Sequence, residues 1–400
     1  MDNIDKNVET LKKAAEYILA DKNEEAKAVI NKELPFVPIH KDSRSYSSVK
    51  QMDQFFRDGF IDRYFGTKLI NPGMLRIFSE KLPERFTFQS QGETFESYVV
   101  YRDFQPSMDH IIPISRGGTN DPSNWATTSV KGNSAKSIFT LEQLNWHLHT
   151  QGDIHEWDGL SGLFVALVEK EPDLKHINGV SGWYNATKSA MKNLNEGLYQ
   201  NSRTKTYNDK NAEILKQAAE CLLAGKLEEA SSVIQDCYSF IPTRRESRSY
   251  TAIEQMGQFF KDGFIDRYFG TKQINPGMLR LLSEKLPVEF PYQPHWKTDE
   301  CHMAYWDYQP TMDHIVPITL GGKNDSSNWV TTSMKGNLAK KNYTLKQLNW
   351  HLCPEGDIRE WDGLSGLFVR IVEKEPELKQ ISRVNYWYNA TKRVMKNYSL

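Results

Sequence analysis

The residues whose types and spacing best suit chemistry lie in one short segment of the chain. Asp109 and His110 are adjacent in a short apolar run over 108–114 with Pro113 near its end, and a loop rich in glycine and asparagine follows. Asn124 closes this loop, and Asn133 follows where a helix is expected to begin. Carboxylate and amide oxygens are the ligands that Mg²⁺ prefers, and an imidazole that titrates near neutrality can accept a proton from water. The segment therefore offers a divalent-cation site beside a general base.

The same set of residues occurs a second time. His110 and His314 lie 204 positions apart, and this offset holds through nearly the whole of each half. The second set is Asp313, His314, Asn328 and Asn337. Solenoid repeats have periods of about 20–50 residues, so this is a repeat of another kind. We expect a duplicated domain, with copies at 1–195 and 208–400 joined by a polar linker at 196–207, arranged as a pseudo-dimer about an approximate twofold axis.

Local patterns place each set on a strand, loop, strand and helix. We expect a strand over 108–114, a polar loop over 115–123 and a second strand over 125–128. A helix is expected to begin at Gly132 and to continue past Thr140. This ββα arrangement would bring the aspartate of the first strand and the asparagine of the helix to one point.

Most of the remaining sequence predicts helices. Apolar residues at helical spacing over 8–30 indicate a pair of core helices, and Thr140-Leu141-Glu142-Gln143 has the pattern of a capping box. One further strand is expected at 98–101, ahead of the motif. The expected fold class is thus α+β and predominantly helical, with two tandem domains that each carry a ββα motif.

Asp-His, Gly-Gly, Asn and a helical Asn, in this order within 103–140 and 307–344, resemble the HNH motif of the ββα-metal endonucleases. In that family the histidine is the general base, and the aspartate and the last asparagine bind the metal. The middle asparagine holds the loop so that a backbone carbonyl orients the histidine ring. By this resemblance the bases are His110 and His314, and the organising residues are Asn124 and Asn328. The metal ligands would be Asp109, Asn133, Asp313 and Asn337.

The resemblance also implies a cofactor and a substrate. Mg²⁺ or Mn²⁺ would be the metal and double-stranded DNA the substrate, while the family's zinc-binding cysteine pairs are absent, so no structural zinc is expected. Lys136 and Lys340 lie one helical turn beyond the ligand asparagines, where they are expected to meet a phosphate. Further candidate DNA contacts are Lys131, Lys335, Arg44 and Arg248. The segments around the two arginines also suit ordinary helix caps.

Composition excludes several classes of protein. The formal net charge is -1, so DNA binding would need a local basic surface rather than a basic chain. No stretch approaches the length of a membrane span, and the N-terminus lacks the pattern of a signal peptide. The four cysteines have no counterparts in the first half, which argues against a structural disulfide. We therefore expect a cytoplasmic protein that functions as a monomer.

These observations favour a restriction-type DNA endonuclease whose two sites cut opposite strands. A homing, phage or less specific HNH nuclease is a second enzymatic interpretation. A non-catalytic DNA-binding scaffold is a third, from another functional class. Against the third, neither copy has lost the aspartate, the histidine or an asparagine of the motif.

Overall fold

The computed structural model describes residues 2–38, 46–83, 86, 98–199, 207–237 and 250–398. The contacts of the chain divide it into two compact units. Unit 1 consists of Met1–Asp42 and Glu246–Leu400, and unit 2 of Ser43–Arg245. Both are α+β and mostly helical, with a small antiparallel sheet in each, which confirms the predicted class. Within the described residues, no helix has the length and apolar character needed to cross a membrane.

The units of packing differ from the predicted halves of the sequence. The hairpin formed by α1 (Asp2–Leu19) and α2 (Asn23–Glu33) belongs to unit 1, whose other elements all come from the second half. The hairpin of α9 (Lys210–Leu223) and α10 (Leu227–Cys237) belongs to unit 2. The predicted linker at 196–207 therefore falls inside unit 2 and not between the units. Residues 200–206 of this linker lie outside the described part.

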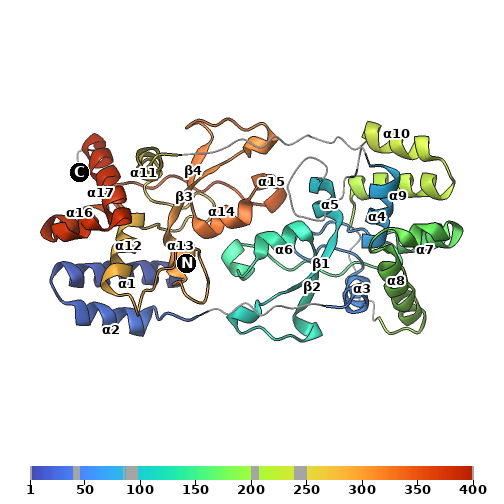
Figure 1. Ribbon diagram of the computed structural model, residues 1–400, viewed down its shortest axis with the longest axis horizontal. Helices are drawn as coiled ribbons and strands as arrows, with labels where there is room; N and C mark the ends of the chain where they lie inside the picture. Colours follow the sequence, from blue (N-terminus) through green and yellow to red (C-terminus); the bar gives the residue numbers. More distant parts are fainter. Residues whose placement is uncertain are drawn as a thin grey trace. The chain divides into compact units, whose positions relative to one another are not determined.

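Unit 2 is organised around an aromatic and aliphatic core. Besides α9 and α10, its described elements are α3 (Ser48–Arg57), α4 (Pro72–Lys81), α5 (Tyr98–Phe104), β1 (Pro106–His110), β2 (Trp125–Ser129), α6 (Val130–Lys136), α7 (Ser161–Lys170) and α8 (Val180–Asn195) (Figure 1). Asn71 accepts a hydrogen bond from Gly73 N and so caps α4. Its amide nitrogen donates to Ser161 and Thr187, at 3.0 and 2.9 Å, and thereby joins α4 to α7 and α8.

Unit 1 contains an equivalent series of elements. These are α11 (Ala252–Lys261), α12 (Pro276–Lys285), α13 (Ala304–Tyr308), β3 (Pro310–His314), β4 (Trp329–Ser333), α14 (Met334–Lys340), α15 (Leu345–Leu348), α16 (Ser365–Lys374) and α17 (Ser382–Met395). Asn275 takes the place of Asn71 and donates to Ser365 and Thr391. In this unit α1 packs against α12 and α16, as Figure 1 shows, and in unit 2 α9 packs against α7.

The ββα arrangement predicted for the motif is present in both units. β1 pairs with β2 in antiparallel register, with Asp109 opposite Ala126 and His110 opposite Trp125. α6 follows β2 directly, and Ser129 caps it by accepting a hydrogen bond from Gly132 N. β3, β4 and α14 have the same order and the same register. Both helices pack on their strands, so the aspartate, histidine and asparagines of each motif lie in one small region.

Three details of the predicted secondary structure are wrong. The first strand of the motif ends at His110 rather than at residue 114, and Ile114–Arg116 is a 3-10 helix, because Pro113 has no backbone N–H with which to continue the strand pairing. Residues 98–101 belong to the helix α5 and not to a strand, because Tyr101 and Phe104 are buried at helical spacing. The helix after Gly132 ends at Lys136, well before Thr140, because Ser137 has a positive φ of 49°. The predicted capping contacts at Thr140 are nevertheless present, since Thr140 and Gln143 exchange backbone-to-side-chain hydrogen bonds of 3.0 and 3.3 Å.

Candidate active site

Two fully buried carboxylates hold β2 in place beneath the site. Asp58 accepts a hydrogen bond from Thr127 N at 2.7 Å and forms an ion pair with Arg63 at 2.7 Å. Asp62 accepts a hydrogen bond from Ser129 N at 2.8 Å. A buried charge is tolerated only where such partners compensate for its desolvation. The turn between α3 and α4 therefore fixes the strand whose partner, β1, carries the candidate catalytic residues.

Asn124 holds the loop that follows β1. Its side-chain oxygen accepts from Ile112 N at 2.9 Å, and its nitrogen donates to Ile112 O and Thr119 O at 2.9 and 2.8 Å. Gly118 is required beside it, because a Cβ at that position would lie 1.9 Å from Ile112 O. The side chain thus joins the two ends of the loop.

The ring of His110 is held by the side chain of Asn120. His110 Nε2 lies 3.0 Å from Asn120 Oδ1, which also accepts from the Tyr46 hydroxyl at 2.7 Å and from Trp125 Nε1 at 3.3 Å. An indole nitrogen can only donate, so the amide atom that faces it must be the oxygen. In the neutral ring Nε2 therefore carries the proton that it donates to Asn120, and Nδ1 is the nitrogen that can accept one. The expected ring partner was a backbone carbonyl; at Nε2 it is this side-chain oxygen.

Asp109 projects from the other face of β1 and is held at one of its two oxygens. Asp109 Oδ2 accepts from the Tyr64 hydroxyl at 2.8 Å and lies 3.1 Å from Lys136 Nζ. Lys136 also donates to His110 O at 2.6 Å. Burial lowers the pKa of Lys136, although Asp109 opposes this effect. Both contacts fall on Oδ2, so Oδ1 is the oxygen that a cation would take.

Lys136 and Lys340, which were predicted to meet a phosphate, have their side chains inside the motif. Both side chains are fully buried, and each forms an ion pair with the aspartate of its own motif. The prediction rested on their position one helical turn beyond the asparagines, whereas lysine side chains are rarely buried. A buried ammonium beside a carboxylate is the exception, since each charge compensates the other.

Asn133 lies against β1 beside Asp109. Its side-chain nitrogen donates to Ser107 Oγ at 2.8 Å and to Met108 O at 3.2 Å. A carbonyl can only accept, so these contacts fix the orientation of the amide and direct Oδ1 away from them. Ser107 and Asp109 are two residues apart on the strand and therefore share a face. The amide oxygen and the carboxylate are thus brought to the same side of the ββα unit.

Unit 1 contains the same arrangement. Tyr268 donates to Asp313 Oδ2 at 2.7 Å, Asn337 donates to Thr311 Oγ1 at 3.1 Å, and Asn324 Oδ1 lies 3.0 Å from His314 Nε2. Asn328 holds the loop by hydrogen bonds to Val316 N, Val316 O and Lys323 O.

One contact differs between the two units. Trp329 Nε1 approaches His314 Nε2 directly, at 3.2 Å, whereas Trp125 Nε1 approaches Asn120. A donor now faces the ring nitrogen itself. The assignment of the ring proton made for His110 therefore does not extend to His314.

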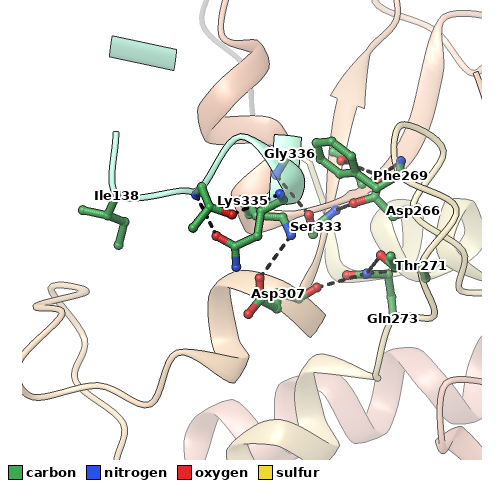
Figure 2. Close-up of polar contacts among 12 residues, drawn as sticks. Ile138, Asp266, Phe269, Thr271, Gln273, Asp307, Ser333, Lys335 and Gly336 are labelled. Carbon is green, nitrogen blue, oxygen red and sulfur yellow. Dashed lines mark hydrogen bonds and ion pairs between the residues drawn. The ribbon is translucent and has the colours of Figure 1, made fainter. Parts of the chain in front are cut away.

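Two of the other predicted DNA contacts, Lys131 and Lys335, form ion pairs with a carboxylate of their own unit. Lys131 lies 3.2 Å from Asp103, and Lys335 lies 3.2 Å from Asp307. Figure 2 shows Lys335 beside Asp307 at the start of α14, where Ser333 bonds to Asp266 and Gly336. Burial raises the pKa of Asp103, while Lys131 opposes the shift. The predicted contacts Arg44 and Arg248 lie outside the described residues.

Three residues at the site of unit 2 were missed by the sequence reasoning. Tyr46 and Asn120 contact the candidate base, and Tyr64 contacts the candidate metal ligand. Each is identical in the second half at the offset of 204, as Tyr250, Asn324 and Tyr268. Asn120 also lies inside the motif loop. Identity at the offset was the available signal, although it does not separate site residues from core residues.

The donor atoms fit a hard divalent cation. Among the described residues, no group of three or more His, Cys, Asp and Glu side chains gathers. A cation held by Asp109 and Asn133 would therefore rest on one carboxylate, one amide and oxygens from water or phosphate. Mg²⁺ is commonly bound in this way, through one or two protein groups.

Comparison with known proteins finds one family model that matches part of the chain. A family model described as HNH endonuclease matches residues 102–137, which span β1, the loop, β2 and α6. The match lies on the ββα framework derived above and indicates a nuclease domain. No curated protein and no solved structure matches the chain.

Proposed function

We propose that this protein is a metal-dependent DNA endonuclease of restriction type. It carries two candidate active sites, one in each unit, and acts as a monomer in which the two sites cut opposite strands of one duplex. The observation that carries the proposal is the joint placement of His110, Asp109, Asn124 and Asn133 on one ββα unit, with their equivalents on a second. The two units are, in this proposal, duplicated HNH domains.

His110 is assigned the role of general base. Its Nδ1 would take a proton from the attacking water while Nε2 keeps its own proton on Asn120 Oδ1, 3.0 Å away. The positive charge that forms on the ring is then stabilised by this amide oxygen and by Tyr46. Asn124 keeps Asn120 in position through the loop.

Asp109 Oδ1 and Asn133 Oδ1 are assigned as the protein ligands of Mg²⁺ or Mn²⁺. When bound, the ion would neutralise charge on the scissile phosphate and on the departing 3′ oxygen. Tyr64 and Lys136 hold the carboxylate through its other oxygen and so keep its geometry fixed. Asp313 and Asn337 have the same roles in unit 1.

Two fused units also allow an asymmetric target. Arg116 of one loop corresponds to Leu320 in the other, and Thr119 corresponds to Lys323. Loops that differ in charge can contact different bases or phosphates, so the two half-sites need not be identical. Double-stranded DNA with a non-palindromic target is therefore the proposed substrate.

The test is cleavage of supercoiled plasmid with Mg²⁺, compared with the same reaction in excess chelator. We expect cleavage only with the metal, and loss of cleavage in the Asp109→Asn, Asp313→Asn double variant. This variant keeps an oxygen for the tyrosine and lysine partners of each aspartate but removes the negative charge, and circular dichroism checks that the fold is retained. Undiminished cutting in the chelator would refute the metal-dependent mechanism.

The same experiment distinguishes two alternative functions from the proposed one. A defined fragment pattern supports a restriction-type enzyme, whereas a smear supports a less specific HNH nuclease. DNA binding without cleavage under any metal condition would identify a non-catalytic scaffold.

A further inference from the structure

The two helical hairpins are exchanged between the two sequence copies. The hairpin α1–α2 is encoded beside the helices of unit 2 but packs in unit 1, and α9–α10 is encoded beside the helices of unit 1 but packs in unit 2. In both units the apolar face of the first hairpin helix is buried, with Leu11 and Leu215 at equivalent positions. The exchange is therefore reciprocal.

One hydrogen bond, present in both units, joins each hairpin to a lysine of the other sequence copy. In unit 1, Lys374 Nζ donates to Leu19 O, at the end of α1, at 2.7 Å. In unit 2, Lys170 Nζ donates to Leu223 O, at the end of α9, at 2.6 Å. Lys170 and Lys374 are equivalent at the offset of 204, and so are Leu19 and Leu223. The same lysine thus meets the same helix end in both units, each time across the two copies.

In both units the lysine donates to the last residue of a helix. The last carbonyls of a helix have no intrahelical donor and carry partial negative charge, so an ammonium placed there is stabilising. One further ion pair in each unit joins the first helix of the hairpin, or the turn after it, to the rest of the unit. Lys374 lies 2.6 Å from Asp21 in unit 1, and Lys68 lies 2.6 Å from Glu213 in unit 2.

We propose that the surfaces centred on α16 in unit 1 and on α7 in unit 2 are docking sites for a helical hairpin supplied by the other sequence copy. Each copy then completes the unit that contains the other copy's motif. The partner that fits this surface is a second copy of the same sequence, so a chain with one copy would complete its fold by exchanging hairpins with a second molecule. This inference is independent of the proposed nuclease activity, because it concerns packing alone.

Zero-length cross-linking of the full chain distinguishes exchange from pairing within each copy. A carbodiimide joins a lysine to a carboxylate only when the two are in contact. Exchange predicts the cross-link Lys374–Asp21, whereas pairing within one copy predicts Lys170–Asp21. Asp21 is suited to this comparison because its equivalent in the second copy is Gly225, so the peptide is assigned to one copy without ambiguity.

A second lysine–carboxylate pair, in unit 2, also distinguishes exchange from pairing within one copy. Exchange predicts Lys68–Glu213, and pairing within one copy predicts Lys68–Glu9. Mass spectrometry of peptides from the monomeric band detects the cross-links of both pairs. Recovery of Lys170–Asp21 or Lys68–Glu9 in place of the expected peptides would overturn the proposal.

A protease site inserted between Gln200 and Tyr207 turns the same reaction into a gel assay. After cross-linking and cleavage, we expect the two fragments to stay joined in denaturing gels, because each cross-link connects residues on opposite sides of the cut. The matched variant Lys68→Arg, Lys374→Arg keeps both charges but cannot be coupled, and its fragments should separate. Fragments that separate in the parent protein, or cross-links found only in a species of twice the mass, would overturn exchange within one chain.

Discussion

Replacement of Asn124 by alanine should open one catalytic loop and leave the other unit as an internal control. The variant loses three hydrogen bonds, to Ile112 N, Ile112 O and Thr119 O. A polar group left without its partner costs about 1–3 kcal/mol, and the lower end applies here because the loop is partly exposed and water can reach it. Three such groups destabilise the closed loop by about 3 kcal/mol. The loop opens locally, and the rest of the fold is retained.

The chemical consequence follows from the position of Asn120 in that loop. Asn120 holds His110 Nε2, so a loop that opens releases the candidate base. A tenfold change in rate corresponds to about 1.4 kcal/mol, and a loss of about 3 kcal/mol therefore predicts a decrease of about 10²-fold at this site. Supercoiled plasmid should accumulate as nicked circle, because the site of unit 1 still cuts its strand. Asn328→Ala should nick the opposite strand, which end-labelled duplex DNA would show.

Two results would refute this reasoning. If Asn124→Ala converts plasmid to linear product at the parent rate while hydrogen exchange shows the loop open, the loop does not position the base. If the variant loses both cuts, the two sites are not independent. Asn124→Asp is a matched control, since it keeps the acceptor for Ile112 N but places a carboxylate against two carbonyls. It should therefore perform no better than the alanine variant.

Three further predictions concern single side chains. His110→Ala should slow cleavage of one strand by about 10²–10⁴-fold and His314→Ala that of the other, as expected for loss of a general base, measured as nicked plasmid. Tyr64→Phe should lower the free energy of unfolding by about 1.5–3 kcal/mol, because it removes a buried hydrogen bond to a carboxylate, and should raise the Mg²⁺ concentration needed for cleavage. Burial lowers the pKa of His302 from 6.5 to about 4, so the unfolded chain binds the proton more tightly, and stability is lost as pH falls from 6.5 towards 4. About 2 kcal/mol should be lost by pH 5, and the difference from His302→Gln in urea unfolding at pH 7.5 and pH 5 measures it.

The ββα framework could be predicted because its signals are local. Two short apolar runs flank a loop rich in glycine and asparagine, and Ser129 and Gly132 set the start of the helix. Asp109 and Asn133 lie within 24 positions of each other, so the hairpin and one helix are enough to bring them together. The confirmed part of the prediction is the ββα framework, which depends on residues close together in the sequence.

The surroundings of the site depend on distant residues and could not be predicted. Tyr64 is 45 positions before Asp109, and Tyr46 is 64 positions before His110. No periodicity relates such pairs, because tertiary packing alone brings them together. The helix at 98–104 was mistaken for a strand for a related reason: its valines and tyrosines favour strands, and packing of Tyr101 and Phe104 overrides that preference.

The exchange of hairpins was hidden by the repeat itself. Where two copies offer nearly identical hairpins to nearly identical surfaces, the residues of the interface are the same for either pairing. The local interaction energies are then almost equal, and chain connectivity decides between the two pairings. Sequence patterns report which faces are buried but contain no information on which copy covers them.

The buried lysine of each motif shows how one carboxylate can serve two functions. Lys136 and Tyr64 both contact Oδ2 of Asp109, and Lys340 and Tyr268 both contact Oδ2 of Asp313. Each lysine is fully buried, and a buried ammonium without a partner would be strongly destabilising, so the folded protein needs this ion pair even before any metal binds. Because the partners take one oxygen, the other is the oxygen to which the proposed cation would bind. In the proposed mechanism, stability and metal binding would therefore use different oxygens of the same side chain.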